Sequence, residues 1–384
     1  MKITIPKNEL NNAMNKIKGV AASRTALPVL TNVLLEAEGT RLRLTASDLN
    51  ISIECTIDCT VIEAGATTAP CQRLSMLLGD LPDADVTLTL HDNGILDVEC
   101  GLINIKFYTI SADEFPPSHD FSSIKPFYLK QAVLKKLFHQ TAYAVCNDQS
   151  RHNITGLLME TKQDGMHVVA TDGKRLSMSV SEDAIPTEEE AEEGSAKAAK
   201  FLKDIKTIIP SKTIHELQSL LTDNIDKSVA VYLGDNKAAF IFENLQVTTA
   251  LIEGNFPNYT AVIPKKIGKE FILDLDTFRQ CMRRCASMTS DKFRTVKFIF
   301  HDDNMQIIVK TPEIGEYEEN IPVGYQGEKL EISFNPNFIL DVLRNINSEQ
   351  VCLQFNDGNS PGIIKPYTEA PVDSYINVIM PIRA

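Results

Sequence analysis

The chain ends in SYINVIMPIRA, residues 374–384, where apolar residues continue to within two positions of the terminus. Such a short apolar run is typical of a β-strand, whereas most chain ends are polar and frayed. Two earlier stretches resemble the tail, INIKFYTI at 103–110 and LQVTTALI at 245–252, and each continues through a Phe-Pro pair into a linker. We therefore interpret the tail as the third copy of one strand, without a linker after it.

The repeat extends beyond this strand. Asp48 in LTASDL corresponds to Asp172 in VATDGKRL, 124 residues later, and Phe115-Pro116 corresponds to Phe256-Pro257, 141 residues later. The middle copy therefore holds about 17 extra residues, which fall in the acidic stretch EDAIPTEEEAEEGSAKAAK at 182–200. This stretch lacks an apolar period, so we expect a solvated, mobile loop.

Six short clusters of Gly, Asn and Asp each separate two alternating apolar runs. They are AEGT (37–40), HDNG (91–94), KQDG (162–165), GDNK (234–237), HDDN (301–304) and NDGN (356–359). These residue types tolerate the positive φ of hairpin turns, so each cluster predicts a hairpin. Asp and His also occur at metal and catalytic sites, but six similar clusters at equivalent places favour turns.

A segment with helical periodicity precedes each hairpin. The predicted helices cover 7–18, 72–78, 129–145, 211–221, 275–286 and 335–346. Asn335 before Pro336 and Asp276 before Thr277 are predicted helix starts, which explains LDLD (273–276) by capping rather than by a pair of catalytic carboxylates. The chain thus consists of six helix-plus-strands units, paired into three longer repeats.

The net charge of −13 by itself argues against binding to nucleic acid. The predicted helices differ from the rest, because they hold twelve lysines and arginines against four acidic residues. Any one of these charges is an ordinary surface charge, but a bias in all six helices indicates a shared role. Six such units around an axis, with helices inward, would make a ring with a basic lumen that passes a polyanion and an acidic rim that repels it.

Other classes of protein are poorly supported. We expect a cytoplasmic protein, because the sequence has neither a secretory signal nor eighteen consecutive apolar residues. The eight cysteines lack zinc spacing and are expected to be reduced, mostly buried thiols. An enzyme is the main rival, but the sequence contains no phosphate loop, zinc set or serine-elbow motif.

Several motifs resemble the bacterial DNA polymerase III beta subunit family, the replicative sliding clamps. They are RTALPVLTNVLLEAEGTRLRLTASDL (24–49), VATDGKRL (169–176), FPNYTAVIP (256–264), SDKFRTVKF (290–298) and VIMPIRA (378–384). The resemblance implies an α+β DNA-clamp architecture with helices lining a ring and sheets outside. It implies three similar domains of two helix-plus-strands units each, at 1–122, 126–257 (acidic insertion about 182–200) and 268–384.

The same resemblance implies a processivity factor for DNA replication. Two copies would form a homodimeric ring that encircles duplex DNA, slides along it without sequence preference and tethers the replicative polymerase. No catalytic residue, cofactor or metal is expected, and no membrane partner. A clamp-fold scaffold that binds proteins without encircling DNA is the closer rival.

In the family, the polymerase, the clamp loader and repair proteins insert short linear peptides into an apolar pocket. The matching residues are Ile154, Thr171, Gly173, Lys174, Arg175, Leu176, Pro257, Val262, Val378, Met380, Ile382 and Arg383. Two positions depart from relatives, since Lys174 replaces a ring-bearing residue and Ala261 lies where some carry arginine. A tight turn after a core strand would also explain residues 171–175, and edge-strand packing would also explain Met380 and Ile382.

The resemblance implies two further surfaces. Phosphate-contacting positions match Arg24, Arg73, Arg151 and Lys212, and Gln149 lies beside such a position. None is expected to contact bases, because a clamp slides over any sequence. The dimer contact would bring Ile105 and Phe107 near Met288, with acidic residues of EIGEYEEN (313–320) facing Lys106.

Overall fold

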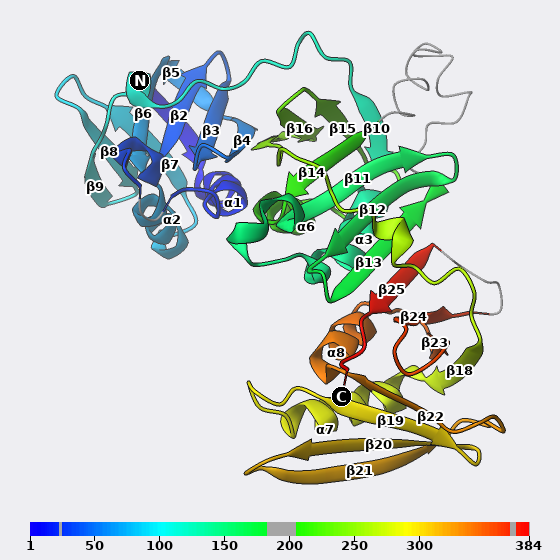
Figure 1. Ribbon diagram of the computed structural model, residues 1–384. Coiled ribbons are helices and arrows are strands. Elements are labelled where there is room, and N and C mark those ends of the chain that lie inside the picture. Colours follow the sequence, from blue (N-terminus) through cyan, green and yellow to red (C-terminus); the bar gives the residue numbers. More distant parts are fainter. Residues whose placement is uncertain (23–24, 183–204, 369–373, 384) are drawn as a thin grey trace. The chain divides into compact units, whose positions relative to one another are not determined.

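The computed structural model describes residues 1–22, 25–182, 205–368 and 374–383 (Figure 1). Most of the acidic insertion and Arg24 lie outside the described residues. By internal packing the chain divides into two compact units, which are residues 1–132 with 215–251, and 133–214 with 252–384.

The first unit contains two antiparallel sheets. The five-stranded sheet has the order β5 (Thr60–Glu63), β1 (Lys2–Pro6), β7 (Asp85–Leu90), β8 (Ile95–Cys100) and β9 (Ile103–Tyr108). The eight-stranded sheet has the order β10 (Phe127–Lys130), β15 (Ser228–Leu233), β16 (Lys237–Phe242), β17 (Leu245–Ala250), β4 (Ile51–Asp58), β3 (Arg41–Ser47), β2 (Asn32–Glu38) and β6 (Gly65–Pro70). Helices α1 (Lys7–Ile17) and α2 (Cys71–Asp80) lie side by side.

The second unit is built in the same way. Its eight-stranded sheet has the order β14 (Lys206–Pro210), β11 (Gly156–Lys162), β12 (Gly165–Thr171), β13 (Arg175–Ser181), β25 (Tyr375–Ile379), β24 (Gly362–Tyr367), β23 (Gln350–Phe355) and β18 (Lys269–Asp274). The four-stranded sheet has the order β21 (Gly315–Pro322), β20 (Asn304–Thr311), β19 (Val296–His301) and β22 (Leu330–Phe334). Helices α7 (Leu275–Ser287) and α8 (Pro336–Arg344) pack together, and the division between the units passes through α3 (Gln131–Thr141) and α6 (Ser211–Leu220).

All six predicted helices are present, with shifted ends. Each described helix buries one face at helical spacing, as α1 does with Leu10, Ala13, Met14 and Ile17. The predicted helix 129–145 exceeds the observed helix by more residues than any other prediction. At its start, residues up to Lys130 belong to strand β10. Residues 142–144 form a separate 3₁₀ turn after α3.

The two predicted helix starts have different outcomes. Asn335 does cap α8, since its side chain accepts a hydrogen bond from the backbone N–H of Asn337 at 3.0 Å. The prediction for Asp276 was wrong, because Asp274 caps α7 by accepting from the N–H of Thr277 at 2.8 Å. Asp276 instead pairs with Arg279 at 2.9 Å. The capping explanation of LDLD therefore holds, but with the other aspartate.

All six predicted hairpins are confirmed, and each cluster connects two paired strands. Positive φ values occur at Gly39, Gly94 and Gly165, as such turns require. In HDDN the two aspartates take this conformation, with φ of 45° at Asp302 and 63° at Asp303.

The shifted helix ends also change the charge distribution. Lys18 and Lys130 lie outside the helices and Asp80 lies inside α2, so the six helices hold ten basic and five acidic residues. Their net charge is +5, and the remainder of the chain carries −18. The basic bias of the helices is therefore confirmed, although it is smaller than predicted.

Two further predictions concern cysteines and membranes. All eight cysteines are free thiols, and seven of them are buried. Among the helices of the described ranges, none is long and apolar enough to cross a membrane.

Candidate functional site

The turn between β12 and β13, residues 171–175, is held by its own side chains. The carboxylate Oδ1 of Asp172 accepts hydrogen bonds from the backbone N–H groups of Lys174 and Arg175, at 2.8 and 3.0 Å. The hydroxyl of Thr171 accepts from the N–H of Gly173 at 3.0 Å and donates to the carbonyl of Arg175 at 2.6 Å. Both aspartate and threonine favour such local bonds, so the TDGKR sequence dictates a tight turn.

Glycine is required in this turn for two reasons. Gly173 has a φ of +84°, which is unfavourable for other residues. A Cβ at this position would lie 2.5 Å from Nη2 of Arg151, because that guanidinium packs over the turn. Arg151 also donates from Nη1 to the carbonyl of Asp172 at 2.7 Å. A residue predicted to contact DNA thus also supports the turn predicted to line the peptide pocket.

The side chain of Arg175 is mostly buried and forms hydrogen bonds to other residues of the protein. It donates to Asp172 at 3.0 Å, to Asp341 of α8 at 2.6 Å and to the carbonyl of Tyr143 at 2.8 Å. Its guanidinium also lies 4.7 Å from the ring centre of Phe338, and only 12% of the side chain is exposed. Arg175 therefore links the turn to α8, whereas Lys174 next to it is exposed. Sequence reasoning missed this role, because Tyr143 and Asp341 are distant in the chain.

The C-terminal strand β25 lies next to the strand that follows this turn. Val378 of β25 pairs with Leu176 of β13, and both side chains are buried. Beyond the strand, the N–H of Met380 donates to the carbonyl of Lys174 at 2.9 Å, and the N–H of Ile382 donates to the carbonyl of Ser333 at 2.8 Å. The backbone is therefore anchored on both sides while the Met380 and Ile382 side chains remain 40% and 37% exposed. Arg383 is also exposed.

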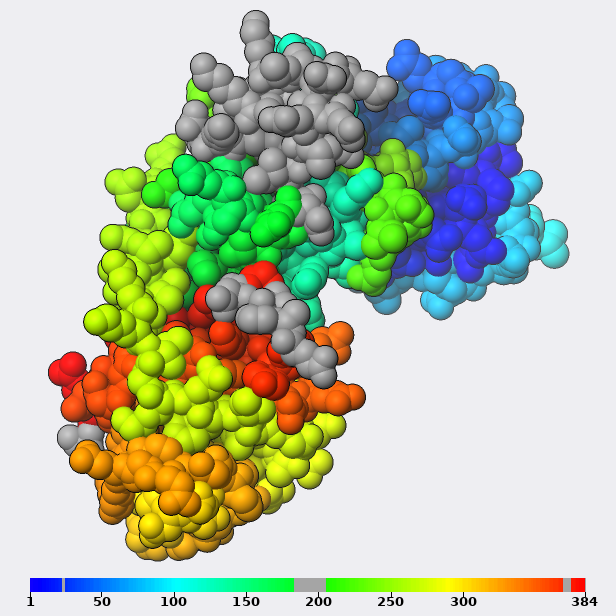
Figure 2. All heavy atoms as spheres, turned by 90° about the vertical axis from the view of Figure 1, so that its right-hand side faces the viewer, coloured from blue at the N-terminus to red at the C-terminus, as the bar shows by residue number. Residues whose placement is uncertain are grey.

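The linker after Phe256 lies over the same apolar cluster. Phe256 and Tyr259 belong to one buried core together with Ile154, Leu176 and Val378. Pro257 is exposed and Val262 is 38% exposed, so the linker adds accessible apolar groups to this region. In Figure 2 the C-terminal residues, in red, reach the surface of the second unit. The twelve predicted pocket residues thus come from four segments of one unit.

A polar network fixes this linker to the sheet. The Tyr259 hydroxyl donates to Glu160 Oε1 at 2.5 Å and accepts from Lys162 Nζ at 2.5 Å. Lys162 also pairs with Glu160 at 2.8 Å. Burial raises the pKa of Glu160, but the hydrogen bonds from Lys162 and Tyr259 and the lysine charge outweigh burial and hold this pKa below its ordinary value of 4.5. Sequence reasoning missed Tyr259, although its place between Pro257 and Val262 was the available signal.

The described residues predicted to contact DNA are solvent-accessible. Arg73 is exposed on α2, and Lys212 is exposed at the start of α6. Gln149 and Arg151 are exposed on the 3₁₀ segment Gln149–Ile154. Arg73 belongs to the first unit and the other three to the second. Each unit therefore presents at least one of these predicted basic groups on a helical segment.

Of the residues predicted to form the dimer contact, two lie on an edge strand and one follows a helix. Ile105 and Phe107 are half-buried on β9, which ends the five-stranded sheet. Met288 follows α7, and its carbonyl accepts from the hydroxyl of Thr311 at 2.5 Å. The charges predicted to face each other already have partners in their own units. Lys106 lies 3.8 Å from Asp97, Glu316 pairs with Lys310 at 2.8 Å, and Glu319 pairs with Arg284 at 2.7 Å.

The Tyr259 network leads to a prediction about stability. Tyr259→Phe leaves Glu160 short of one hydrogen bond in a mostly buried setting, so we expect a loss of about 1–3 kcal/mol of unfolding free energy at neutral pH. Because the folded-state pKa of Glu160 is lowered, its contribution is present above pH 4.5 and is lost as the pH falls through the folded value. The difference between variant and wild type should therefore shrink below pH 4.5.

Urea unfolding across this pH range measures the effect. Tyr128→Phe is the matched control, because Tyr128 is 61% exposed on β10. Equal losses in both variants, or a Tyr259→Phe loss that is independent of pH, would contradict the role given to Glu160.

Comparisons with known proteins identify the family. The chain matches models of the DNA polymerase III beta subunit, with the N-terminal domain at residues 1–119, the central domain at 128–258 and the C-terminal domain at 260–383. It is 30% identical to the beta sliding clamp of Vibrio cholerae over 384 residues, with 100% of both chains covered. It is also 30% identical to the beta sliding clamp of Chlamydia trachomatis, covering 100% of this chain and 87% of that protein.

Solved structures agree with these sequence matches. The DNA polymerase III subunit beta of Pseudomonas aeruginosa superimposes with a TM-score of 0.91 at 30% identity, with 100% of both chains covered. The DNA polymerase sliding clamp of Bacillus subtilis gives a TM-score of 0.91 at 25% identity, covering 100% of this chain and 99% of that one. Because the family models and these relatives span the whole length, the chain belongs to the DNA polymerase III beta subunit family of sliding clamps.

Proposed function

We propose that two copies of this chain close into a ring that encircles duplex DNA and tethers the replicative polymerase for processive synthesis. The observation that carries this proposal is the segregation of charge, with +5 on the six helices and −18 elsewhere. A polyanion is attracted to the helices and repelled by the rest of the surface. The ring holds DNA by topology, so a protein with an acidic total charge can still act on DNA.

The proposal includes the finer assignments of the sequence analysis. The three clamp domains are 1–122, 126–257 and 268–384, and the protein acts in the cytoplasm. The chain is a processivity factor and contributes no catalytic residue, cofactor or metal. Arg24, Arg73, Gln149, Arg151 and Lys212 contact phosphates, which carry no sequence information, and the ring therefore slides over any sequence.

Removing basic side chains from the helices should weaken DNA binding uniformly. We expect the double variant Arg73→Ala, Lys212→Ala to lose affinity equally on different sequences and to lower the salt slope by about 0.9 for each phosphate that is no longer neutralised. The matched control is Arg41→Ala, Lys310→Ala, which removes the same charge from exposed positions on strands β3 and β20. Salt titrations of DNA binding measure the effect. A loss that depends on DNA sequence, or an equal loss in the control, would contradict the assignment.

Edge strands support the dimer. β9 and β21 each end a sheet, and edges of this kind are available for pairing with another chain. β9 also exposes large apolar side chains, since Ile103 and Tyr108 are 38% and 85% exposed. In the proposed head-to-tail arrangement Ile105 and Phe107 of one copy meet the Met288 region of the other.

A charge at this edge should separate the copies. We expect Phe107→Asp to give a folded monomer at micromolar concentration, because a carboxylate would be buried without a partner in the interface. Tyr128→Asp is the control, since Tyr128 is exposed on β10, which ends a different sheet. Sedimentation velocity distinguishes the two states. A monomeric wild-type protein, or a Phe107→Asp dimer, would contradict the proposed contact.

The region around the C-terminal segment is the proposed docking site for partner peptides. Rigidly anchored backbone with exposed methionine and isoleucine side chains suits guests that bury apolar groups, and methionine adapts to different guests. The occupants are short linear peptides of the replicative polymerase, the clamp loader and repair proteins. Two relatives support a ligand-accepting region, since one Pseudomonas aeruginosa clamp was solved with griselimycin and the C. crescentus clamp with PEG at a putative beta-motif tethering region.

Truncating the exposed apolar side chains should weaken peptide binding without unfolding the ring. We expect Met380→Ala, Ile382→Ala to cost about 2–4 kcal/mol of affinity for a polymerase-derived peptide, from the apolar area that the peptide no longer buries. This corresponds to about a thirty- to a thousandfold higher dissociation constant. Met76→Ala, Ile62→Ala is the matched control, because both residues are exposed elsewhere.

The measurement is a fluorescence titration, with melting temperature and native mass recorded for every variant. Unchanged peptide affinity in a folded dimer would contradict the docking site. A collapsed melting temperature would instead show that these residues mainly serve packing.

A further inference from the structure

The turn at residues 47–51 of the first unit repeats the turn at 171–175. The carboxylate Oδ1 of Asp48 accepts from the backbone N–H groups of Asn50 and Ile51, both at 2.9 Å. The hydroxyl of Ser47 accepts from the N–H of Leu49 at 3.2 Å and donates to the carbonyl of Ile51 at 3.2 Å. Leu49 has a φ of +78°, although it is not a glycine. Asp48 thus plays the same structural part as Asp172.

The neighbouring strand also repeats. The N–H of Ala250, just where β17 ends, donates to the carbonyl of Asn50 at 2.7 Å, as the N–H of Met380 does to Lys174. Thr248 pairs with Ser52, whereas Val378 pairs with Leu176. Phe115, which begins the first linker, is buried as Phe256 is. The first unit therefore contains the same turn, strands and linker as the proposed peptide site.

In each unit, part of the eight-stranded sheet lies beside this turn and strand, and we call the sheet face there the floor. The two floors differ in their side chains. Strand register aligns five polar residues of the first unit with five apolar residues of the second. In order they are Thr45, Ser52, Glu54, Gln246 and Thr248 against Val169, Leu176, Met178, Ile376 and Val378. The apolar floor packs against its linker through Phe256 and Tyr259. The same backbone arrangement thus presents a polar floor in one unit and an apolar floor in the other.

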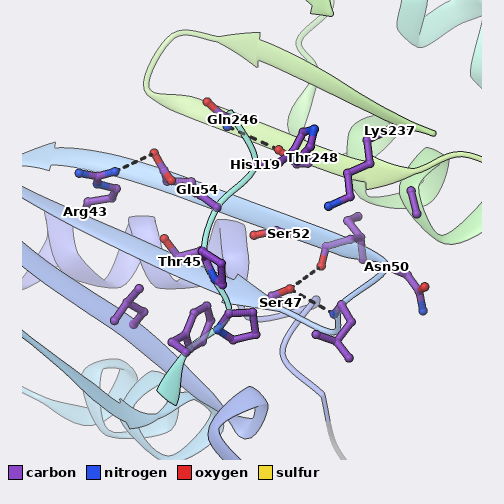
Figure 3. A pocket seen from close by; sticks show the side chains of 18 of the residues that line it. Arg43, Thr45, Ser47, Asn50, Ser52, Glu54, His119, Lys237, Gln246 and Thr248 are labelled. Atoms are coloured by element: carbon purple, nitrogen blue, oxygen red, sulfur yellow. Dashed lines mark hydrogen bonds and ion pairs between the residues drawn. The ribbon is translucent and has the colours of Figure 1, made fainter. Parts of the chain in front are cut away.

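A cavity lies over the polar floor. It has a volume of about 390 Å³, and its other wall is formed by Ala112 and by the start of the linker, through Phe115, Pro116 and Pro117. Volumes of this size are typical of ligand pockets. Figure 3 shows Glu54 with Arg43 at one end and Lys237 near Asn50 at the other, with the hydroxyl groups between them. The cavity is therefore bounded by charged groups at both ends.

Several polar side-chain groups that line the cavity have no hydrogen-bond partner among the described residues. Thr45 is only 6% exposed, but its hydroxyl oxygen is not one of the fully buried atoms, and it has no hydrogen bond to any described residue. Within the same described ranges, the hydroxyl of Ser52 and the ammonium of Lys237 also have no partner. A guest that covered these groups without giving them hydrogen bonds would incur a desolvation cost, so they favour a polar occupant. An apolar guest would leave them unsatisfied.

The charged groups at the two ends of the cavity indicate which charges a bound molecule would carry. Glu36 and Glu54 share one guanidinium, with Arg43 at 3.5 and 3.9 Å, so this end retains one uncompensated carboxylate charge when both are ionised. The other end carries Lys237, with His119 on the linker side. A zwitterionic guest matches these two ends. Peptide amides would satisfy the hydroxyl groups and the Gln246 amide between them.

We propose that this cavity is a second peptide site, which binds a short polar segment with a basic side chain toward Glu54 and an acidic side chain toward Lys237. The inference that the guest is a peptide rests on the proposed function, because the cavity repeats the framework of the proposed docking site. The polar floor would exclude the apolar guests of that site and so separate two classes of partner segment.

Exchanging the floor tests the proposal on the full-length protein. The probe is the capped tripeptide acetyl-Lys-Ser-Asp-amide, followed by two-dimensional NMR. We expect weak, saturable binding to wild type, with shifted signals from residues around the cavity. Thr45→Val, Ser52→Leu, Thr248→Val copies the apolar floor and should bind the probe at least about tenfold more weakly. Glu54→Gln, which preserves shape, should also weaken binding and serves if the triple variant does not fold.

Two controls separate this site from the proposed docking site. Met380→Ala, Ile382→Ala should bind the probe normally, and the floor variant should bind the polymerase-derived peptide normally. Absence of saturable binding to wild type, or equal binding by the floor and Glu54→Gln variants and by wild type, would overturn the proposal. Saturation by sorbitol without saturation by the tripeptide would overturn the peptide assignment. Failure of the polymerase-derived peptide to bind wild type would count against the proposed function alone.

Discussion

Antiparallel pairing between strands of different repeats is the interaction on which the structure depends. β17 pairs with β4 in the first unit, and β25 pairs with β13 in the second. Each pairing joins two half-sheets into a continuous sheet of eight strands and covers both strand edges that would otherwise need protection. The final strand must therefore remain apolar close to its end, because it lies in the interior of a sheet.

The pairing of β17 with β4 and of β25 with β13 also fixes the position of the residue at which the chain leaves each sheet. In both units a residue at the end of the strand, Ala250 or Met380, donates its N–H to a carbonyl of the turn that precedes the paired strand. The turn is held by one aspartate, Asp48 or Asp172, which satisfies two backbone N–H groups. This framework leaves the floor side chains free to differ, because none of these bonds involves them. One backbone arrangement can thus serve an apolar site and a polar site.

Local signals in the sequence predicted the elements well. Hairpins were predictable because Gly, Asn and Asp tolerate positive φ, and helices because their buried faces follow the helical period. The cap of α7 was misassigned between two aspartates two residues apart, since the choice depends on which side chain reaches the N–H of Thr277. The hydrogen bonds that Arg175 makes to Asp341 and Tyr143 were not predictable, and neither was the cavity over Thr45. Both depend on contacts between distant segments, and a threonine on a strand looks like an ordinary surface residue in the sequence.

Topological linkage to DNA is the central claim, and retention on a nicked circular duplex tests it most directly. The wild-type protein is loaded onto the circle by the clamp loader, and the complex is separated from free protein at high salt, where phosphate contacts are screened. Our account predicts that the protein stays on the intact circle and is released once a restriction enzyme makes the circle linear. Retention on the linear DNA, or release from the intact circle at high salt, would contradict the account.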